Sequence, residues 1–256
     1  MDDIFAHIDA HAGEYVERLR RLCRQPSIST LNVGMADAAD LVVHMLGNLG
    51  VSARLIPLEG GHPVIYGELA AGAGKTLAFY NHYDVQPPDP LDQWRTDPFA
   101  AEIRDGYIYA RGVSDNKGDL VARICAVESY LAVRGRLPAN LKFIVEGEEE
   151  IGSPHLGLFA DTHRDLIAAD AFLWEGGSRD SRGRPEISLG CKGIAYVELS
   201  TTAANTDVHS MWAPIVPNGA WRLVWALSTL KDRQERVLFL ASMTKYARPH
   251  RQSWTR

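Results

Sequence analysis

The chain is predicted to be an α/β protein, in which helices flank a mostly parallel sheet, followed by a second, smaller α+β domain. Strand-like and helix-like segments alternate along the first part of the chain, which is typical of a parallel sheet covered by helices. Three short apolar segments, 77–80, 141–145 and 171–174, are bounded by turn residues, as buried strands are. After a polar linker at 179–185 this alternation stops.

The first elements are predicted from the spacing of apolar residues. From 4 to 24 these residues recur every three or four positions, which predicts one continuous helix. A second helix is predicted over 36–49, where the same spacing stops at a glycine. Two strand-like segments, 52–58 and 63–69, follow, and a glycine pair between them indicates a turn.

The central part of the chain adds a hairpin and a long helix to the three buried strands. Residues 102–110 alternate around Asp105-Gly106, which predicts a hairpin. A glycine-bounded turn at 112–118 leads into a helix over 119–133. Each buried strand ends in a loop with His or acidic residues. Because ligands bind beyond the carboxyl ends of parallel strands, we expect these loops to share one site.

The second domain begins near residue 187. It is predicted to contain a strand over 194–202 and a helix over 217–231. With only about 70 residues left in the chain, its core is expected to be small.

Composition and charge exclude several classes of protein. The chain has 256 residues, 27 of them basic and 32 acidic, so its net charge is −5. It therefore lacks the positive field that nucleic-acid or anionic-membrane partners require. No segment reaches the roughly 18 apolar residues of a membrane span, and the acidic start resembles no secretory signal. The three cysteines fit no disulfide framework and no C-x-x-C motif, so we expect a cytoplasmic protein.

The loop after the first buried strand and the glycine-bounded turn hold candidate metal ligands. His82 and Asp84 are two residues apart, so their side chains point the same way if the chain is extended. The His could bind a metal while the Asp orients it, although such a pair also occurs in ordinary surface turns. Asp115 could bridge two ions or simply cap the next helix. The residues alone leave these alternatives open.

Four glutamates follow the second buried strand: Glu146, Glu148, Glu149 and Glu150. Carboxylates this close repel one another unless a cation compensates them or one stays protonated. A divalent metal meets that need, and it lets one glutamate bind the ion while its neighbour acts as a general base. Glu175, after the third strand, would be a further ligand. Such a mixed O/N set suits Zn²⁺ or Mn²⁺.

Four motifs occur in order: HYDVQP at 82–87, GVSDNKG at 112–118, EGEEEIGS at 146–153 and DVHS at 207–210. Together they resemble the co-catalytic zinc metallopeptidase superfamily, which includes carnosinase-type dipeptidases, carboxypeptidase G, aminoacylase, acetylornithine deacetylase and succinyl-diaminopimelate desuccinylase. The dipeptidase branch is the most similar. The resemblance implies a metallopeptidase-like catalytic domain over 1–186 and part of a ferredoxin-like lid and dimerisation domain over 187–237.

The resemblance also implies a role for each candidate residue. Two Zn²⁺ ions are expected, with Mn²⁺ or Co²⁺ possible, and their ligands would be His82, Asp115, Glu150 and Glu175. Asp84 would orient His82, and Glu149 would be the general base. His209, in the lid, would stabilise the oxyanion in the active site of a partner subunit.

The activity that the resemblance implies is hydrolysis of peptide or amide bonds in small substrates, dipeptides or N-acyl amino acids, by a water that two metal ions activate. A homodimer would form through the lid if the lid is intact. Relatives are longer and add a late His ligand, which no His near the end of this chain matches. The similarity stops at Val237, so we expect 238–256 to be an aberrant, frameshift-like tail. The alternative is a truncated, inactive fragment of such an enzyme.

Overall fold

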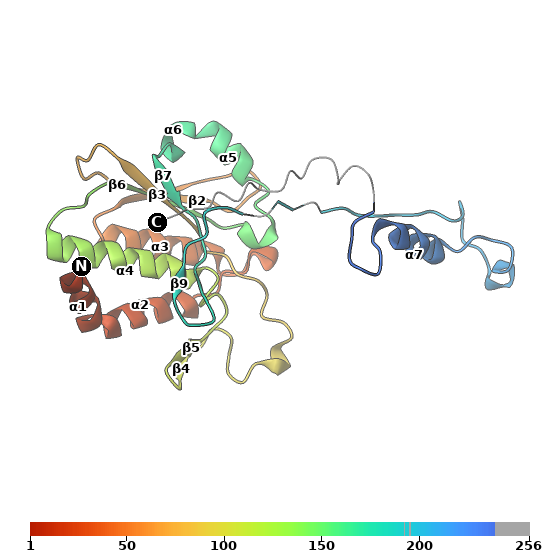
Figure 1. The fold of residues 1–256 in the computed structure, drawn as a ribbon, viewed down its shortest axis with the longest axis horizontal. Coiled ribbons are helices and arrows are strands. Elements are labelled where there is room, and N and C mark those ends of the chain that lie inside the picture. Colours follow the sequence, from red (N-terminus) through yellow and green to blue (C-terminus); the bar gives the residue numbers. More distant parts are fainter. Residues whose placement is uncertain (192, 195, 239–256) are drawn as a thin grey trace. The chain divides into compact units, whose positions relative to one another are not determined.

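The computed structural model describes residues 1–191, 193–194 and 196–238. The chain divides into two compact units, Met1–Ile187 and Ser188–Arg256 (Figure 1). The first unit contains the sheet and nearly all of the candidate site residues. In the described part of the second unit, one short 3₁₀ turn and one α-helix are formed.

The elements of the first unit are as follows. Its helices are α1 (Asp2–Ala10), α2 (Ala12–Arg24), α3 (Met35–Asn48), α4 (Lys117–Arg134), α5 (Leu156–Thr162) and α6 (Arg164–Ile167), with 3₁₀ turns η1 (Ser29–Leu31), η2 (Leu91–Gln93) and η3 (Glu149–Ile151). Its strands are β1 (Ser52–Ile56), β2 (Val64–Leu69), β3 (Thr76–His82), β4 (Glu102–Arg104), β5 (Tyr107–Tyr109), β6 (Asn140–Glu146), β7 (Ala171–Leu173), β8 (Ser178–Arg179) and β9 (Pro185–Glu186).

The central sheet has the strand order β1-β2-β6-β3-β7. β3 pairs in parallel with both β6 and β7, whereas β2 is antiparallel to both β1 and β6. Four of the five strands therefore share one direction, and the predicted fold class is confirmed. β2 runs the other way because the connection from β1 is too short for the crossover that a parallel pair needs.

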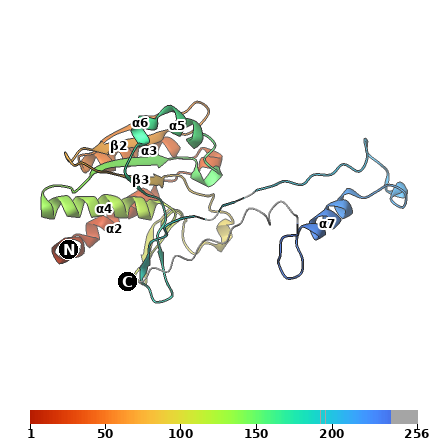
Figure 2. The ribbon, with the colours of Figure 1, turned by 45° about the horizontal axis from the view of Figure 1, so that its top comes forward.

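Successive residues of the strands build two apolar layers, one on each face of the sheet. Ile65 and Phe143 pack with buried residues of α2, α3 and α4. Tyr66 and Ile144 point the opposite way and pack with Phe159 of α5 and with residues of α6. Figure 2 shows α4 on one side of the sheet and α5 and α6 on the other. The period of two along each strand is what separates the layers.

The continuous helix predicted over 4–24 is wrong, because the helix breaks at His11. There φ is −108° and ψ is 9°, and the ring Nδ1 donates a hydrogen bond to the His7 carbonyl at 2.8 Å. The apolar spacing continues across the break because α1 and α2 both pack against α4. Periodicity therefore reports the shared packing surface and not the continuity of the helix.

Two further predictions in the first unit need correction. The segment 171–174 does form a strand, but it is not buried: Phe172 and Leu173 are 45% and 43% exposed. β7 lies at the end of the sheet, and apolar composition does not distinguish an edge strand from a central one. The predicted linker at 179–185 is a short hairpin, in which β8 and β9 pair. The hairpin around Asp105-Gly106 is confirmed as β4 and β5.

The second unit contains η4 (Ser210–Trp212) and α7 (Gly219–Leu230). The helix predicted over 217–231 is thus confirmed, and the Asn218 side chain caps it by accepting from the backbone N–H of Ala220 at 2.9 Å. The strand predicted over 194–202 is wrong for the described residues there, which join no strand. The ferredoxin-like lid stays a prediction, and the tail predicted over 238–256 lies outside the described residues except for Leu238. Among the described residues, no helix has both the length and the apolarity needed to cross a membrane.

Candidate metal centre

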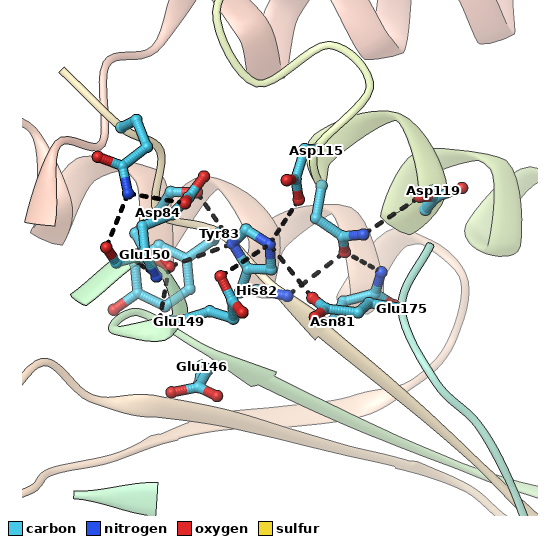
Figure 3. A network of polar contacts seen from close by, with 12 residues as sticks. Asn81, His82, Tyr83, Asp84, Asp115, Asp119, Glu146, Glu149, Glu150 and Glu175 are labelled. Atoms are coloured by element: carbon cyan, nitrogen blue, oxygen red, sulfur yellow. Dashed lines mark hydrogen bonds and ion pairs between the residues drawn. The ribbon is translucent and has the colours of Figure 1, made fainter. Parts of the chain in front are cut away.

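The candidate site lies where the parallel strands end (Figure 3). His82 is the last residue of β3, Glu149 and Glu150 begin η3 shortly after β6, and Glu175 follows β7. Asp115 comes from the turn before α4. Because β3, β6 and β7 are parallel, their carboxyl ends meet at one edge of the sheet, as the sequence predicts.

The Nε2 atom of His82 faces carboxylate oxygens from separate segments of the chain. It lies 2.9 Å from Asp115 Oδ1 and 3.2 Å from Glu175 Oε2. Glu149 Oε2 is 3.9 Å away. The His82 side chain is fully buried, whereas Asp115 is mostly exposed. One ring nitrogen is therefore the centre of the whole arrangement.

The other ring nitrogen of His82 is already occupied by Asp84. His82 Nδ1 lies 3.0 Å from the Asp84 carbonyl and 3.2 Å from Asp84 Oδ1. Both are acceptors, so Nδ1 carries the proton, and in the neutral ring Nε2 directs a lone pair at Asp115 and Glu175. Burial alone would lower the pKa of His82, but Asp84 and then Glu175 raise it to about 10. The carboxylates around the ring therefore favour a positive charge at Nε2, either a proton or a metal ion.

Glu175 is a second sign that a cation belongs here. Its Oε2 is buried and has no hydrogen bond in the described part of the chain, since the 3.2 Å approach to His82 lacks hydrogen-bond geometry. Burial raises the pKa of Glu175 to about 7, and the charges of Glu149 and Asp115 contribute to the same shift. A metal ion would remove the cost of this unpaired oxygen.

The turn at η3 presents the remaining two carboxylates. Asp84 accepts hydrogen bonds from the backbone N–H groups of Glu149 at 3.2 Å and Glu150 at 3.1 Å, so it holds this turn as well as His82. Gln86 Nε2 donates to Glu150 Oε2 at 3.0 Å. Burial raises the pKa of Glu150.

Within the described residues, two groups of three side chains could each hold an ion. One is His82, Asp115 and Glu175, and the other is His82, Glu149 and Glu150; in each, the ligand atoms lie within 4.8 Å of one another. One imidazole and several carboxylates form the mixed O/N set that Zn²⁺ and Mn²⁺ accept, so the residues present fit a divalent metal. Both groups contain His82, so they belong to one centre.

Of the four glutamates at the end of β6 and in the turn after it, only Glu149 and Glu150 join the candidate ligands. Glu146 is buried on the far side of the turn and accepts hydrogen bonds from Tyr80 Oη and, at 2.9 Å, from Ser153 Oγ. Glu148 is also buried and pairs with His155 Nδ1 at 2.8 Å. Both glutamates therefore have partners other than the candidate ligands.

His209, the remaining candidate, belongs to the second unit. Its ring Nδ1 accepts a hydrogen bond from Met211 N at 3.2 Å at the start of η4, and the side chain is exposed. Neither group of candidate ligands includes it.

A layer of polar residues behind the ligands was missed by the sequence analysis. Arg123 of α4 donates to the Tyr80 carbonyl and to Asn81 Oδ1, both at 2.6 Å, and to the Trp174 carbonyl. Asn116 accepts from the Asn81 side chain, and its own amide donates to Asp119. Only Arg123 had a signal: a charged residue among the apolar positions of a buried helix face.

The sequence is similar to a known peptidase family and to curated dipeptidases. A sequence model described as peptidase family M20/M25/M40 matches residues 78–238. The beta-Ala-His dipeptidase of Homo sapiens is 33% identical over 258 residues, which cover 93% of this chain and 51% of that protein. The Cys-Gly metallodipeptidase dug1 of Schizosaccharomyces pombe is 29% identical and is matched over 96% of this chain and 56% of its own length.

Solved structures show the same fold. The M20 family metallo-carboxypeptidase Sso-CP2 from Sulfolobus solfataricus superposes with a TM-score of 0.82 at 43% identity, covering 88% of this chain and 51% of that one. Human carnosine dipeptidase 1 has a TM-score of 0.69 at 28% identity, covering 93% and 54%. The chain therefore spans about half the length of the proteins that it matches.

Proposed function

Because the chain belongs to peptidase family M20/M25/M40, we propose that it hydrolyses the peptide or amide bond of small substrates, dipeptides or N-acyl amino acids, with divalent metal ions held around His82. The observation that carries the proposal is the His82 ring, whose Nδ1 is taken by Asp84 while Nε2 faces Asp115 and Glu175. The chain spans about half of its relatives, so the activity of the whole protein is part of the proposal.

The contacts support part of the proposed ligand assignment. His82, Asp115 and Glu175, which lie together, would hold one ion. Glu150 would bind a second ion, and Asp115 would bridge the two, as the resemblance to metallopeptidases implies. Zn²⁺ is the proposed ion because one imidazole with carboxylates suits it, and Mn²⁺ and Co²⁺ are the alternatives. Metal bound here would polarise the scissile carbonyl and lower the pKa of a water molecule.

The protein's own residues then move the proton. Glu149 is the proposed base: its side chain is 34% exposed and faces His82 Nε2, so it can reach a water beside the ligands. It would take the proton from that water and pass it to the leaving amine. Asp84 would fix the ring of His82 and the η3 turn together, since it contacts both. The base and the ligands would therefore keep one relative geometry.

The cell compartment and the assembly are proposals of the same kind. We propose that the chain acts in the cytoplasm, which its three unpaired cysteines support. We also propose that a homodimer forms and that His209 stabilises the oxyanion of the partner's substrate. The support is the DVHS motif and the exposure of His209, which leaves the side chain available.

Metal content and turnover, measured on one preparation, test the proposal. The purified full chain is assayed for bound metal per chain and for hydrolysis of beta-Ala-His, Cys-Gly and N-acetyl amino acids. The proposal expects bound divalent metal and turnover that a chelator removes and Zn²⁺ or Mn²⁺ restores. His82→Ala serves as the control and should lose both metal and turnover.

The inactive fragment is the competing outcome. A chain that unfolds cooperatively yet binds no divalent metal and cleaves no member of the panel would overturn the proposed activity. The metal measurement also separates metal binding from hydrolysis. Bound metal without turnover would support the metal centre and contradict the proposed activity.

A further inference from the structure

Away from the metal centre, the first unit has a pocket lined by arginines. It has a volume of about 440 Å³ and is formed by the loop 89–96, the β4–β5 hairpin and Arg111, which precedes the glycine-bounded turn. Its charged residues are Arg95, Arg104, Arg111 and Asp89. None of them belongs to the candidate metal ligands, so this pocket is a separate feature of the chain.

Two of the three guanidinium groups have no carboxylate partner in the described residues. Arg95 is exposed and makes no ion pair or side-chain hydrogen bond within the part of the chain that the structure describes. Arg111 donates through Nη2 to the Pro87 carbonyl at 3.0 Å. Arg104, by contrast, pairs with Glu102 at 3.2 Å. Among the described residues, the buried Nε of Arg111 has no hydrogen-bond partner. The guanidinium charge is therefore incompletely compensated by the protein, and an anion beside it in the pocket would be favoured.

Aromatic rings position two of the guanidinium groups. Arg111 Cζ lies 5.4 Å from the ring centre of Trp94, and Arg104 Cζ lies 4.2 Å from that of Tyr109. Trp94 is itself held by a hydrogen bond from Nε1 to the Pro88 carbonyl at 2.7 Å. Guanidinium groups that stack on rings keep their N–H edges available for oxyanions with two acceptor oxygens.

We propose that this pocket binds a phosphate group, as inorganic phosphate or as a small phosphomonoester. A phosphate group carries about −1.5 to −2 charges at neutral pH and three acceptor oxygens. In the described residues Arg95 and Arg111 have no ion-pair partner, so their two positive charges would attract that anion, and the Asp89 carboxylate on the pocket wall opposes them in part. The pocket volume suits a small molecule, and the net charge of −5 disfavours a long polyanion such as nucleic acid.

Isothermal titration of the full chain with inorganic phosphate tests the proposal. A chelator is present throughout so that a metal ion at His82 cannot hold the phosphate, and sodium chloride keeps the ionic strength constant. Arg111→Gln should weaken binding about tenfold or more, because it removes a charge-assisted bidentate donor. Arg95→Gln should also weaken binding. The matched control is Arg136→Gln, an exposed arginine outside the pocket.

The outcomes decide the proposal in both directions. The proposal is supported if phenyl phosphate binds with the same affinity as inorganic phosphate or with a higher one. A higher affinity for phenyl phosphate would indicate a phosphomonoester as the ligand. Equal affinity in the wild type and both pocket variants, or no heat from phosphate at all, overturns it, as does malonate that binds as tightly as phosphate. If Arg111→Gln does not unfold cooperatively, the exposed Arg95→Gln variant decides alone.

Discussion

The two ring nitrogens of His82 make different contacts, and the other candidate residues lie around them. Nδ1 is fixed by Asp84 from its own loop, whereas Nε2 faces carboxylates from two other segments. The orienting contact is local in sequence and the ligand contacts are distant. The orientation of the ring therefore depends on a residue two positions away, whereas its contacts with Asp115 and Glu175 depend on the fold.

Replacement of Glu149 tests whether it acts as a general base while other residues bind the metal. Glu149→Gln should lower kcat by about 10²–10⁴-fold, because general acid–base catalysis contributes that much. Metal content should stay close to that of the wild type, since His82, Asp115, Glu150 and Glu175 remain. Steady-state kinetics and metal analysis on the same samples measure both effects.

An exposed glutamate outside the site gives the control for that substitution. Glu59→Gln removes the same charge from a surface position and should leave kcat unchanged. Full activity in Glu149→Gln would remove Glu149 from its role. Loss of metal together with activity would reassign it as a ligand.

The sequence predicted the candidate ligands and the supporting Asp84, but not the polar residues behind them, Arg123, Asn81 and Asn116. His82, Asp115, Glu150 and Glu175 were found because each follows a strand or begins a helix at the same edge of the sheet. The separate environments of Glu146 and Glu149 could not be predicted, because they depend on which side of a tight turn each residue faces. That choice is made by tertiary partners such as Tyr80 and Ser153.

The central strand β6 contributes buried side chains to both faces of the sheet. Phe143 is fully buried there, in the layer under α3 and α4. Phe143→Ala should lower the free energy of unfolding by about 3–5 kcal/mol, the cost of a large cavity in a packed core. Phe172→Ala, on the exposed strand β7, should cost far less. Urea unfolding of both variants measures the difference, and equal losses would contradict this account of the core.

An ion pair connects α1 to the end of α4. Arg134 forms two hydrogen bonds with the Asp3 carboxylate, one of them at 2.8 Å. The hydrogen bond from Arg134 lowers the pKa of Asp3 to about 2 from its ordinary value of 3.8. Because the folded pKa is the lower one, this pair stabilises the fold above the ordinary pKa and loses its effect as pH falls toward 2.

That pH dependence is testable by substitution. The difference in unfolding free energy between the wild type and Asp3→Asn should shrink as pH falls from about 5 to about 2. Urea unfolding at each pH measures it. Asp2→Asn is the matched control, because it changes the neighbouring charge without this pair, and its effect should not follow the same curve. A difference that stays constant with pH would contradict the assignment.

Most element positions could be predicted from periodicity, whereas their continuity and exposure could not. The strands at β3 and β6 and the helix α4 appear close to where apolar spacing places them. The break between α1 and α2 was hidden because both helices bury residues against the same neighbour. β7 was taken as buried because its composition is apolar, and only the strand order shows that it is an edge.

The division of the chain into two units predicts unequal resistance to protease. Residues up to Ile187 enclose two apolar layers, whereas α7 exposes large apolar side chains, with Trp221 and Trp225 59% and 62% exposed. Limited digestion with a protease of broad specificity should therefore begin beyond residue 187 and leave the first unit as a resistant product.

Mass spectrometry of the digestion time course identifies that product. Added Zn²⁺ should slow later cleavage of the first unit, because a bound ion stabilises the folded state. His82→Ala is the control that should lose this protection. Simultaneous disappearance of both units would contradict their independence.

The sheet ends differently at its two margins. β1 carries Arg54 at one margin, whereas β7 at the other is an uncharged run of alanine, phenylalanine and leucine, and in the described residues no strand pairs with its outer side. Charged side chains on an edge strand disfavour pairing with a strand of another molecule. An apolar edge strand without charges favours such pairing and therefore aggregation. At high concentration, self-association through the sheet should therefore begin at β7, and Phe172→Lys should reduce it.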